Sequence, residues 1–369
     1  MRGPGIDAVR EAIGRLPRVP LAHLPTPLED APRLTAALGG PRILIKRDDM
    51  TGMALGGNKT RMFEYVLAKA LADGADTVVA GAAVQSNYAR QLAAGCARLG
   101  LACHLVLRRT RGAADDQIQG SLLLDLVVGA HVDLVDGSRE DQMEALRAVA
   151  ARERGRGRSV YLALIADERD KWLQAAAYVS GYLEMLDQAT ACGIAVDHIY
   201  AATLEATHGG LMVGILGCNS PTRLRAISPN EASVWPGRTI EEEVARVANE
   251  VADNLGIPLG VTPADVDITT RYAGERYGAV TPDALAALRL FGRTEALILD
   301  PVYTAKGAAG LIDEIRQGRV GAGETVVFWH TGGAPALFAY AAELGFSVGA
   351  PSGAGAGTGT MASTIGGTA

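Results

Sequence analysis

The sequence predicts an α/β fold of two three-layer domains, each with a mostly parallel, twisted sheet between layers of helices. Short apolar runs recur along the chain, separated by stretches whose apolar residues have helical spacing. Strands that alternate with helices in this way form parallel sheets with helices on both faces. Because the runs form two series, we expect two such sheets meeting at a cleft, the usual place for a ligand.

The expected strands divide the chain into domains. The first series is DTVVAGA (76–82), ACHLVLR (102–108), AHVDLVD (130–136) and SVYLALIA (159–166). The second is HIYAATL (198–204), RLRAISP (223–229), ALILDPVY (296–303) and TVVFWHTGG (325–333). Helical patterns cover segments such as 7–16 and 85–100. We therefore expect a smaller domain over residues 51–174 and a larger one from residues 1–50 and 175–348. Residues 349–369, almost wholly Gly, Ala, Ser and Thr, predict a flexible tail.

Composition excludes several classes of protein. A chain of 369 residues that is 48% hydrophobic and 21% charged can fill the cores of two domains. Its net charge of −6, without a basic patch, argues against a nucleic-acid partner. The first residues lack the apolar segment of a secretory signal, and no apolar run is long enough to span a bilayer. We expect a cytoplasmic protein with no membrane partner.

The cysteines give no sign of a metal or redox site. No two of them have CxxC spacing, so buried, reduced thiols are the expected state and no metal is expected. They are Cys96, Cys103, Cys192 and Cys218.

The strongest chemical signal is KRDDMTGMALGGNKTRMFEYVLAKAL (46–71). Within it, Gly56-Gly57-Asn58-Lys59-Thr60 places a lysine where a glycine turn enters a helix. The helix dipole disfavours an ammonium group at this end, which would make Lys59 a better amine nucleophile. A single lysine at a helix start is more often simply solvated, so the interpretation depends on other segments.

The segment HIYAATLEATHGGLMVG (198–214) has the outline of a phosphate-binding loop. An apolar run leads into a turn, and Gly209-Gly210 follows where a helix would begin. The turn itself contains none of the glycines that such a loop normally needs, and Glu205 places a carboxylate where an anion would bind.

The lysine segment resembles that of the pyridoxal-phosphate enzymes in the D-cysteine desulfhydrase and 1-aminocyclopropane-1-carboxylate (ACC) deaminase family. The similarity extends in order over most of the chain, through segments 24–40, 84–107, 120–135, 272–312 and 326–340. It implies the tryptophan-synthase-β-like architecture called fold type II, with pyridoxal 5′-phosphate as cofactor and a homodimeric assembly.

The resemblance implies roles for residues around the cofactor. Lys59 would form the internal aldimine with the cofactor aldehyde, and Asn87 would hydrogen-bond the pyridine 3-oxygen. Thr304 would meet the pyridine nitrogen, and a hydroxyl there is similar to the desulfhydrase branch. Such a partner would leave the ring a milder electron sink.

Other residues would face the substrate. Ser86 would contact the substrate carboxylate or assist proton transfer, helped by the helix start at Gln85. Tyr303 would be a second acid/base group, and Tyr277 would line the pocket. Each has a structural alternative, since Ser86-Asn87 could be an ordinary helix cap and Tyr303 a half-buried phenol. His330-Thr331-Gly332-Gly333 could be only a tight turn.

Three departures from the family concern the same region. The expected phosphate loop reads Thr203-Leu204-Glu205-Ala206-Thr207, where Thr203, Thr207 and the N–H groups ahead of Gly209 could still hold phosphate with Glu205 turned outward. Tyr88 replaces the family's usual histidine and could stack on the cofactor. ALIADERDKWLQ (163–174) replaces a Gly-Gly-Ser turn and brings the charges of 167–172 to the cleft, as a solvated loop or as a substrate-recognition element.

The leading hypothesis is a pyridoxal-phosphate-dependent lyase or deaminase that acts on a small amino acid. Lys59 would take the Cα proton and the cofactor would hold the carbanion, with β- or γ-elimination, ring opening or replacement all open. The departures favour an altered specificity, such as a specialised biosynthetic step. The alternative is a catalytically silent or pyridoxal-phosphate-independent relative that binds a small molecule in the same cleft.

Overall fold

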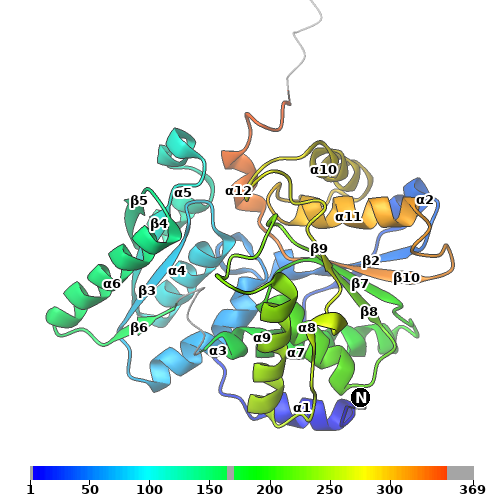
Figure 1. Ribbon diagram of the computed structural model, residues 1–369, viewed down its shortest axis with the longest axis horizontal. Coiled ribbons are helices and arrows are strands. Elements are labelled where there is room, and N and C mark those ends of the chain that lie inside the picture. Colours follow the sequence, from blue (N-terminus) through cyan, green and yellow to red (C-terminus); the bar gives the residue numbers. More distant parts are fainter. Residues whose placement is uncertain (1–2, 164–169, 347–369) are drawn as a thin grey trace, which may run out of the picture.

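Two sheets organise the chain, and helices cover each of them (Figure 1). The computed structural model describes residues 3–163 and 170–346. The smaller sheet has the order β5-β4-β3-β6 and is parallel throughout. Its strands are β3 (Thr77–Ala83), β4 (Ala102–Arg108), β5 (His131–Val135) and β6 (Val160–Leu162).

The larger sheet has the order β1-β2-β10-β7-β8-β9. It is parallel except for β1, which pairs antiparallel with β2 at one edge. Its strands are β1 (Leu28–Asp30), β2 (Arg42–Arg47), β7 (His198–Ala202), β8 (Arg223–Ile227), β9 (Ile268–Thr269) and β10 (Thr325–His330).

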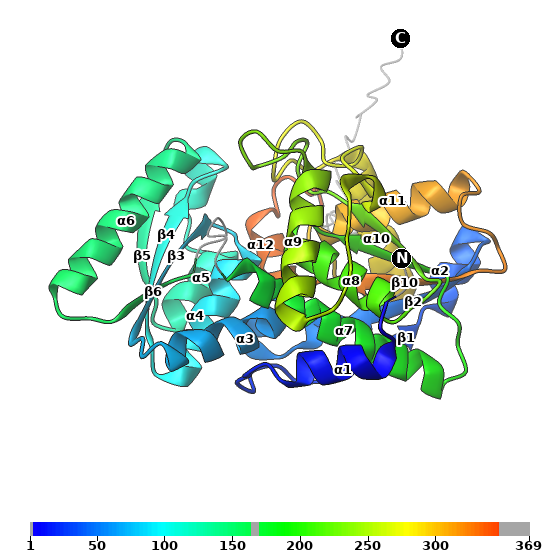
Figure 2. The same ribbon diagram turned by 60° about the horizontal axis from the view of Figure 1, so that its bottom comes forward.

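Helices around the smaller sheet fix where the two sheets meet. Helix α6 (Arg139–Gly155) packs on the outer face, while α4 (Asn87–Leu99) and α5 (Gly120–Val127) cover the other face. Helix α3 (Lys59–Ala72) packs against both α4 and α7 (Lys171–Ala191), so it joins the two halves of the molecule (Figure 2).

The larger sheet is covered by two groups of helices (Figures 1 and 2). One face carries α7 together with α1 (Ile6–Gly14), α8 (Ala206–Gly217) and α9 (Ile240–Leu255). The other carries α2 (Pro32–Leu38), α10 (Pro282–Glu295) and α11 (Thr304–Arg316), and α12 (Ala334–Ala339) follows β10 toward α5. Short 3₁₀ turns are η1 (Asp48–Met50), η2 (Met53–Leu55), η3 (Gly112–Asp116) and η4 (Pro263–Asp265).

The glycines of α8 serve helix packing. A Cβ on Gly210 would lie 2.0 Å from the carbonyl oxygen of Ala175, and one on Gly214 would lie 2.7 Å from Cβ of Tyr182. Both contacts are with α7, so the missing side chains allow the two helices to approach closely. Gly209-Gly210 therefore lies within the body of α8, because the helix begins at Ala206, three residues before the start that the sequence suggested.

Most expected strands form within three residues of their predicted ends. The expected strand 159–166 is shorter, since β6 ends at Leu162, and residues 164–166 lie outside the described residues. The run 296–303 is the exception, because it forms no strand and crosses from α10 to α11 as an irregular segment that is mostly buried but leaves Ile298 exposed. An apolar run shows burial but not whether a pairing partner exists, so sequence alone could not separate these two states. Strands β1, β2 and β9 were not expected.

The two sheets fall on either side of the expected domain boundaries. Strands β3 to β6 lie within residues 51–174, and the other strands lie within 1–50 or 175–348. The boundaries themselves stay a prediction, and the expected tail over 349–369 lies outside the described residues.

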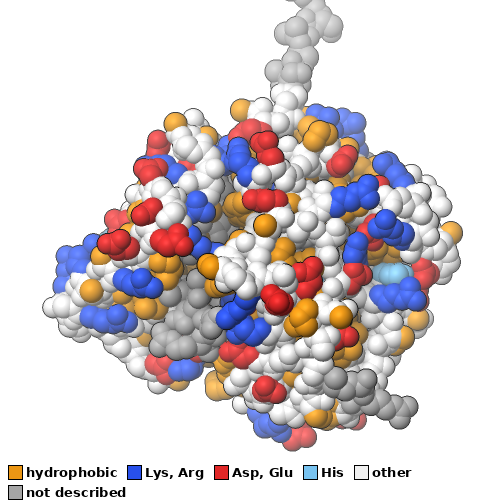
Figure 3. Space-filling view, viewed as in Figure 1, with side chains coloured by type: hydrophobic (Ala, Val, Ile, Leu, Met, Phe, Trp, Pro, Cys, Tyr) orange, Lys and Arg blue, Asp and Glu red, His pale blue; other side chains and the backbone are white. Residues whose placement is uncertain are grey.

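The surface charges, the helix lengths and the cysteines add three observations. Acidic and basic side chains are interspersed over the face in Figure 3. No helix among residues 3–163 and 170–346 is both long and apolar enough to cross a membrane. Cys96, Cys103 and Cys218 are buried free thiols, whereas Cys192 at the end of α7 is exposed, so the expectation of burial is wrong for that residue.

Candidate active site

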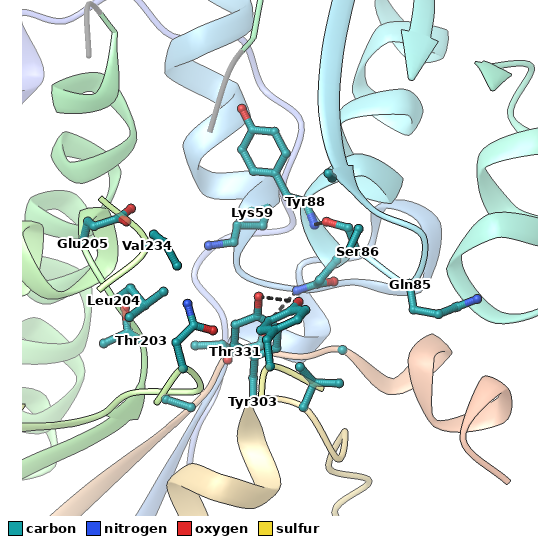
Figure 4. Close-up of a pocket in the computed structure, with 18 of the residues that line it drawn as sticks. Lys59, Gln85, Ser86, Tyr88, Thr203, Leu204, Glu205, Val234, Tyr303 and Thr331 are labelled. Carbon is teal, nitrogen blue, oxygen red and sulfur yellow. Dashed lines mark hydrogen bonds between the residues drawn. The ribbon is translucent and has the colours of Figure 1, made fainter. Parts of the chain in front are cut away.

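A cavity of about 480 Å³ lies between the two sheets (Figure 4). Its walls include the carboxyl ends of β3 and β7 and the first residues of α3, α4 and α8. Such a crevice, where parallel strands end and helices begin, is the usual ligand site of α/β folds. Of the residues predicted for the site, Thr304 alone is not part of the cavity wall.

Lys59 is the first residue of α3, and its amino group points into the cavity toward Thr203, Leu204 and Glu205 (Figure 4). Burial lowers the pKa of this amine to about 8, and the charge of Glu205 opposes that shift. A minority of Lys59, roughly a tenth to a fifth near physiological pH, is therefore neutral and able to act as a nucleophile.

Two glycines bring the turn before Lys59 against the end of β10. Gly57 has φ of 131°, and a Cβ there would lie 2.8 Å from Oδ1 of Asn87. Gly332 has φ of 88°, and its Cβ would lie 2.7 Å from Cα of Gly57. Across this contact the N–H of Asn58 donates to the carbonyl of Thr331 at 2.9 Å. The close approach of the two turns fixes the backbone next to Lys59.

A buried cluster of charges holds α3 in place. The guanidinium of Arg61, only 2% exposed, bonds Asp48 at 2.8 Å and Glu184 of α7 at 2.7 Å. Asp48 also accepts hydrogen bonds from Tyr178 and Trp329. Burial alone would raise the pKa of Glu184, but Arg61 and Lys46 lower it to about 2. The start of α3 is thus tied to the larger sheet two residues from Lys59.

Residues 85–88 lie at the start of α4. The hydroxyl oxygen of Ser86 accepts from the N–H groups of Tyr88 and Ala89, so Ser86 is the helix cap as well as part of the cavity wall. Its hydroxyl hydrogen is still available to a ligand. Asn87 lines the cavity as well, and its amide donates to Thr331 and Asn58 at 3.4–3.5 Å.

Gln85 and Tyr88 direct their side-chain ends away from Lys59 (Figure 4). The amide of Gln85 accepts from the N–H of Ser121 and donates to the carbonyl of Gln119, which anchors the start of α5. The ring of Tyr88 packs edge-on against Phe63, with centroids 4.8 Å apart, in the hydrophobic core. Both residues border the cavity.

Two tyrosines form a hydroxyl pair in the opposite part of the cavity. The oxygens of Tyr303 and Tyr277 lie 2.9 Å apart, and both residues line the wall. Burial raises the pKa of Tyr303 to about 12, although its bond to Tyr277 opposes the shift. The phenol of Tyr303 is therefore protonated at neutral pH and can donate a hydrogen bond or a proton.

Thr304 serves the start of α11. Its hydroxyl donates to the carboxylate of Asp300 at 2.8 Å and accepts from the N–H of Asp300 at the same distance. Asp300 also accepts from the N–H groups of Val302 and Tyr303. These bonds hold Tyr303 at the cavity, and they occupy the hydroxyl that the resemblance assigned to the pyridine nitrogen.

The expected phosphate loop, Thr203 to Thr207, joins β7 to α8 and lines the cavity. Ala206 is the first residue of α8, and no side chain of the described chain caps the helix. The first N–H groups of a helix lack partners within it, so this end can receive an anion. The hydroxyl of Thr207 is 3.4 Å from the amide nitrogen of Asn58.

The side chain of Glu205 does not fold back on α8. One carboxylate oxygen accepts from the indole N–H of Trp235, and the other lies 3.6 Å from Nζ of Lys171. Lys171 belongs to the charged run 167–172, which the sequence placed at the cleft as an element of unknown role. Residues 167–169 of that run lie outside the described residues.

Sequence reasoning did not identify several residues of the wall as ligand-facing. Asn58 and Thr331 join the lysine turn to α8 and β10, and both lay in segments already quoted for other reasons. Asn230 lines the cavity while only 6% exposed, and its side-chain oxygen is a buried acceptor without a partner in the described chain. Nothing in the sequence around Asn230 distinguished it from an ordinary turn residue.

Comparison with known proteins reveals extensive similarity. Residues 19–332 match the family model described as "Pyridoxal-phosphate dependent enzyme". The chain is 37% identical over 341 residues to a 1-aminocyclopropane-1-carboxylate deaminase of Burkholderia vietnamiensis, covering 89% of this chain and 97% of that protein. It is 36% identical over 338 residues to a D-cysteine desulfhydrase of Yersinia enterocolitica, covering 90% and 98%. The crystal structure of an ACC deaminase homologue superposes with a TM-score of 0.82 at 30% identity, covering 92% of this chain and 98% of that one.

Proposed function

Since this chain belongs to the family of pyridoxal-phosphate dependent enzymes, we propose that Lys59, Ser86 and Tyr303 carry its chemistry. Its fold is fold type II, and the enzyme is a pyridoxal-phosphate-dependent lyase or deaminase that acts on a small amino acid. The observation that supports the assignment best is Lys59, whose partly neutral amine faces both the open start of α8 and the cavity that Tyr303 lines.

The residues of the cavity fit the cofactor. Lys59 would hold it through the amine, and the uncapped start of α8 with the hydroxyls of Thr203 and Thr207 would hold its phosphate. Asn87 borders the space between these groups. When bound, pyridoxal phosphate supplies a ring that withdraws electrons from the α-carbon of an amino acid.

Proton transfer then depends on the side chains of this protein. The amine of Lys59, once neutral, can take the proton from the substrate α-carbon. Tyr303 can donate its phenolic proton to a leaving group, since its pKa of about 12 keeps it protonated. The hydroxyl of Ser86 and the acceptor of Asn230 would orient the polar groups of the substrate.

We favour elimination that releases ammonia and a 2-oxo acid, as the names of the D-cysteine desulfhydrase and ACC deaminase relatives suggest. Trp235 and Lys171 do not belong to the segments that carried the family resemblance, and they lie beside a loop that departs from the family. This difference favours a substrate specificity altered for specialised biosynthesis.

Assembly and location stay proposals. We propose a homodimer, which is supported by exposed apolar side chains on and beside α5 and α12, two helices in contact. Val127 is 70% exposed, Phe338 68% and Ile118 61%. A molecular mass in solution twice that of one chain would support the dimer. The cytoplasm remains the expected location.

The test is a screen of small D- and L-amino acids, with ACC included, for release of 2-oxo acid by the purified enzyme. Lys59→Ala is expected to abolish turnover, because Lys59 is the only lysine among the described residues that line the cavity. Tyr303→Phe is expected to lower turnover about 10²-fold or more while leaving cofactor binding intact. A Tyr303→Phe enzyme with full turnover would remove Tyr303 from the mechanism.

A catalytically silent relative is the second candidate, and Glu205 in the phosphate loop is the observation that favours it. Cofactor binding without turnover of any amino acid in the screen would support that alternative.

A further inference from the structure

Glu205 places a negative charge at the site proposed for the cofactor phosphate. It directly precedes the first residue of α8, lines the cavity and has a side chain only 12% exposed. Figure 4 shows it beside Leu204 on the side toward which Lys59 points. Since a phosphate dianion and a nearby carboxylate repel each other, the loop needs a compensating positive charge.

Lys171, the first residue of α7, supplies that charge. Its Nζ lies 3.6 Å from the carboxylate of Glu205 and 3.6 Å from the centroid of the Trp235 ring. The same indole donates its N–H to the other oxygen of Glu205. The ammonium and the indole together hold the carboxylate, and the side chain of Lys171 is only 2% exposed.

Lys171 also contacts Glu243 of α9, at 3.0 Å, but Glu243 does not depend on it. Arg238 and Arg246 lie 2.9 Å and 2.8 Å from the same carboxylate. Within residues 3–163 and 170–346, in contrast, Lys171 is the one cation within ion-pair distance of Glu205. Removing Lys171 would therefore leave Glu205 uncompensated and Glu243 paired.

We propose that Lys171 is a positioning residue for the cofactor phosphate, because it neutralises Glu205 and so allows a loop with a carboxylate to bind a dianion. Lys171 is not part of the cavity wall and acts through Glu205. Lys171 of the charged run and Glu205 of the loop before α8 thus form one unit. This inference rests on the proposed function.

The test compares the affinity of cofactor-free, full-length protein for pyridoxal phosphate and for pyridoxal, which lacks the phosphate. Both affinities are measured well above the Lys59 pKa of about 8, so that a change in that pKa does not alter the fraction of neutral amine. Lys171→Met is expected to weaken pyridoxal phosphate binding about tenfold and leave pyridoxal binding unchanged, because the uncompensated charge of Glu205 acts on the phosphate. Combining it with Glu205→Gln should restore the affinity, and Lys171→Arg should preserve it. Lys69→Met, at an exposed lysine paired with Asp73, is the matched control and should change neither affinity.

Equal losses for both ligands, or a double variant as weak as Lys171→Met, would overturn the proposal. Glu205→Gln alone provides a second test should Lys171→Met fail to fold. It should bind pyridoxal phosphate severalfold more tightly and pyridoxal as before, because Lys171 then adds net positive charge. An unchanged ratio of the two affinities would contradict the proposal. Wild-type protein that takes up neither ligand would instead overturn the proposed function, and the inference with it.

Discussion

The wall of the cavity that carries Lys59 rests on a buried cluster of charges, whereas the wall at the start of α8 rests on ion pairs that extend to the surface. Arg61 bonds both Asp48 and Glu184, and these side chains are at most 15% exposed. At the start of α8, a series of ion pairs leads from Glu205 through Lys171 and Glu243 to Arg238, which is 39% exposed. The first wall holds the segment with the strongest family resemblance, and the second holds two departures.

This difference separates two demands on the enzyme. A reactive lysine must be held in one position, and a buried, multiply bonded cluster provides that rigidity. The side that we propose to meet phosphate and substrate can change in sequence so long as its charge stays balanced. Breaking each wall separately should therefore have different consequences.

The largest effect is expected from Asp48→Asn, which removes the charge that pairs with Arg61 beneath the wall carrying Lys59. Removing one partner of a buried charge cluster leaves the Arg61 guanidinium short of compensation and should cost about 3–5 kcal/mol in free energy of unfolding. Urea denaturation monitored by fluorescence measures the loss.

The matched control is Asp30→Asn, which breaks the ion pair with Arg42 on the surface. Those side chains are 47–53% exposed, so the free energy of unfolding should change by no more than about 1 kcal/mol. Equal losses in the two variants would show that burial gives the Asp48 cluster no special role.

A smaller effect is expected from Thr304→Val, which tests whether Thr304 belongs to the cofactor site or only stabilises the start of α11. The hydroxyl bonds Asp300 at the start of α11, so its loss should lower the free energy of unfolding by about 1–2 kcal/mol. The absorption spectrum of bound pyridoxal phosphate should not change. A shifted spectrum with unchanged stability would instead support the pyridine-nitrogen role that the family resemblance implied.

The smallest effect is expected from Glu205→Gln on the reactivity of Lys59, where the two walls meet. Only the neutral amine captures an aldehyde, so the rate of pyridoxal capture should rise with pH and level off above the Lys59 pKa of about 8. The carboxylate of Glu205 raises that pKa, and Glu205→Gln should therefore move the midpoint to lower pH. A midpoint that moves upward or stays fixed would show that Glu205 does not act on Lys59.

The sequence predicted the parts of the molecule whose signals are local. Alternating apolar runs predicted strands such as β3, β4, β7 and β10. The glycine turn and the family resemblance together singled out Lys59, which lines the cavity. The run 296–303 was misassigned because burial produces the same pattern in a strand and in an irregular segment. The short strands β1 and β9 carry too few residues for a periodic signal.

Contacts between distant segments could not be predicted in the same way. The sequence showed Glu205 as an unfavourable charge and Lys171 as part of a charged run, 34 residues earlier in the chain. Only the packing of α7 against α8, made close by Gly210 and Gly214, brings these two side chains together. The capping role of Thr304 likewise depends on the turn that Asp300 adopts.

The account depends most on Lys59 as the residue that holds the cofactor. The direct test is to load the enzyme with pyridoxal phosphate, reduce it with borohydride and map the modified residue by peptide mass spectrometry. We predict a visible absorption band that reduction abolishes and a cofactor mass on the peptide containing Lys59. No uptake of pyridoxal phosphate, or a modification that falls on another lysine and persists in Lys59→Ala, would contradict the account.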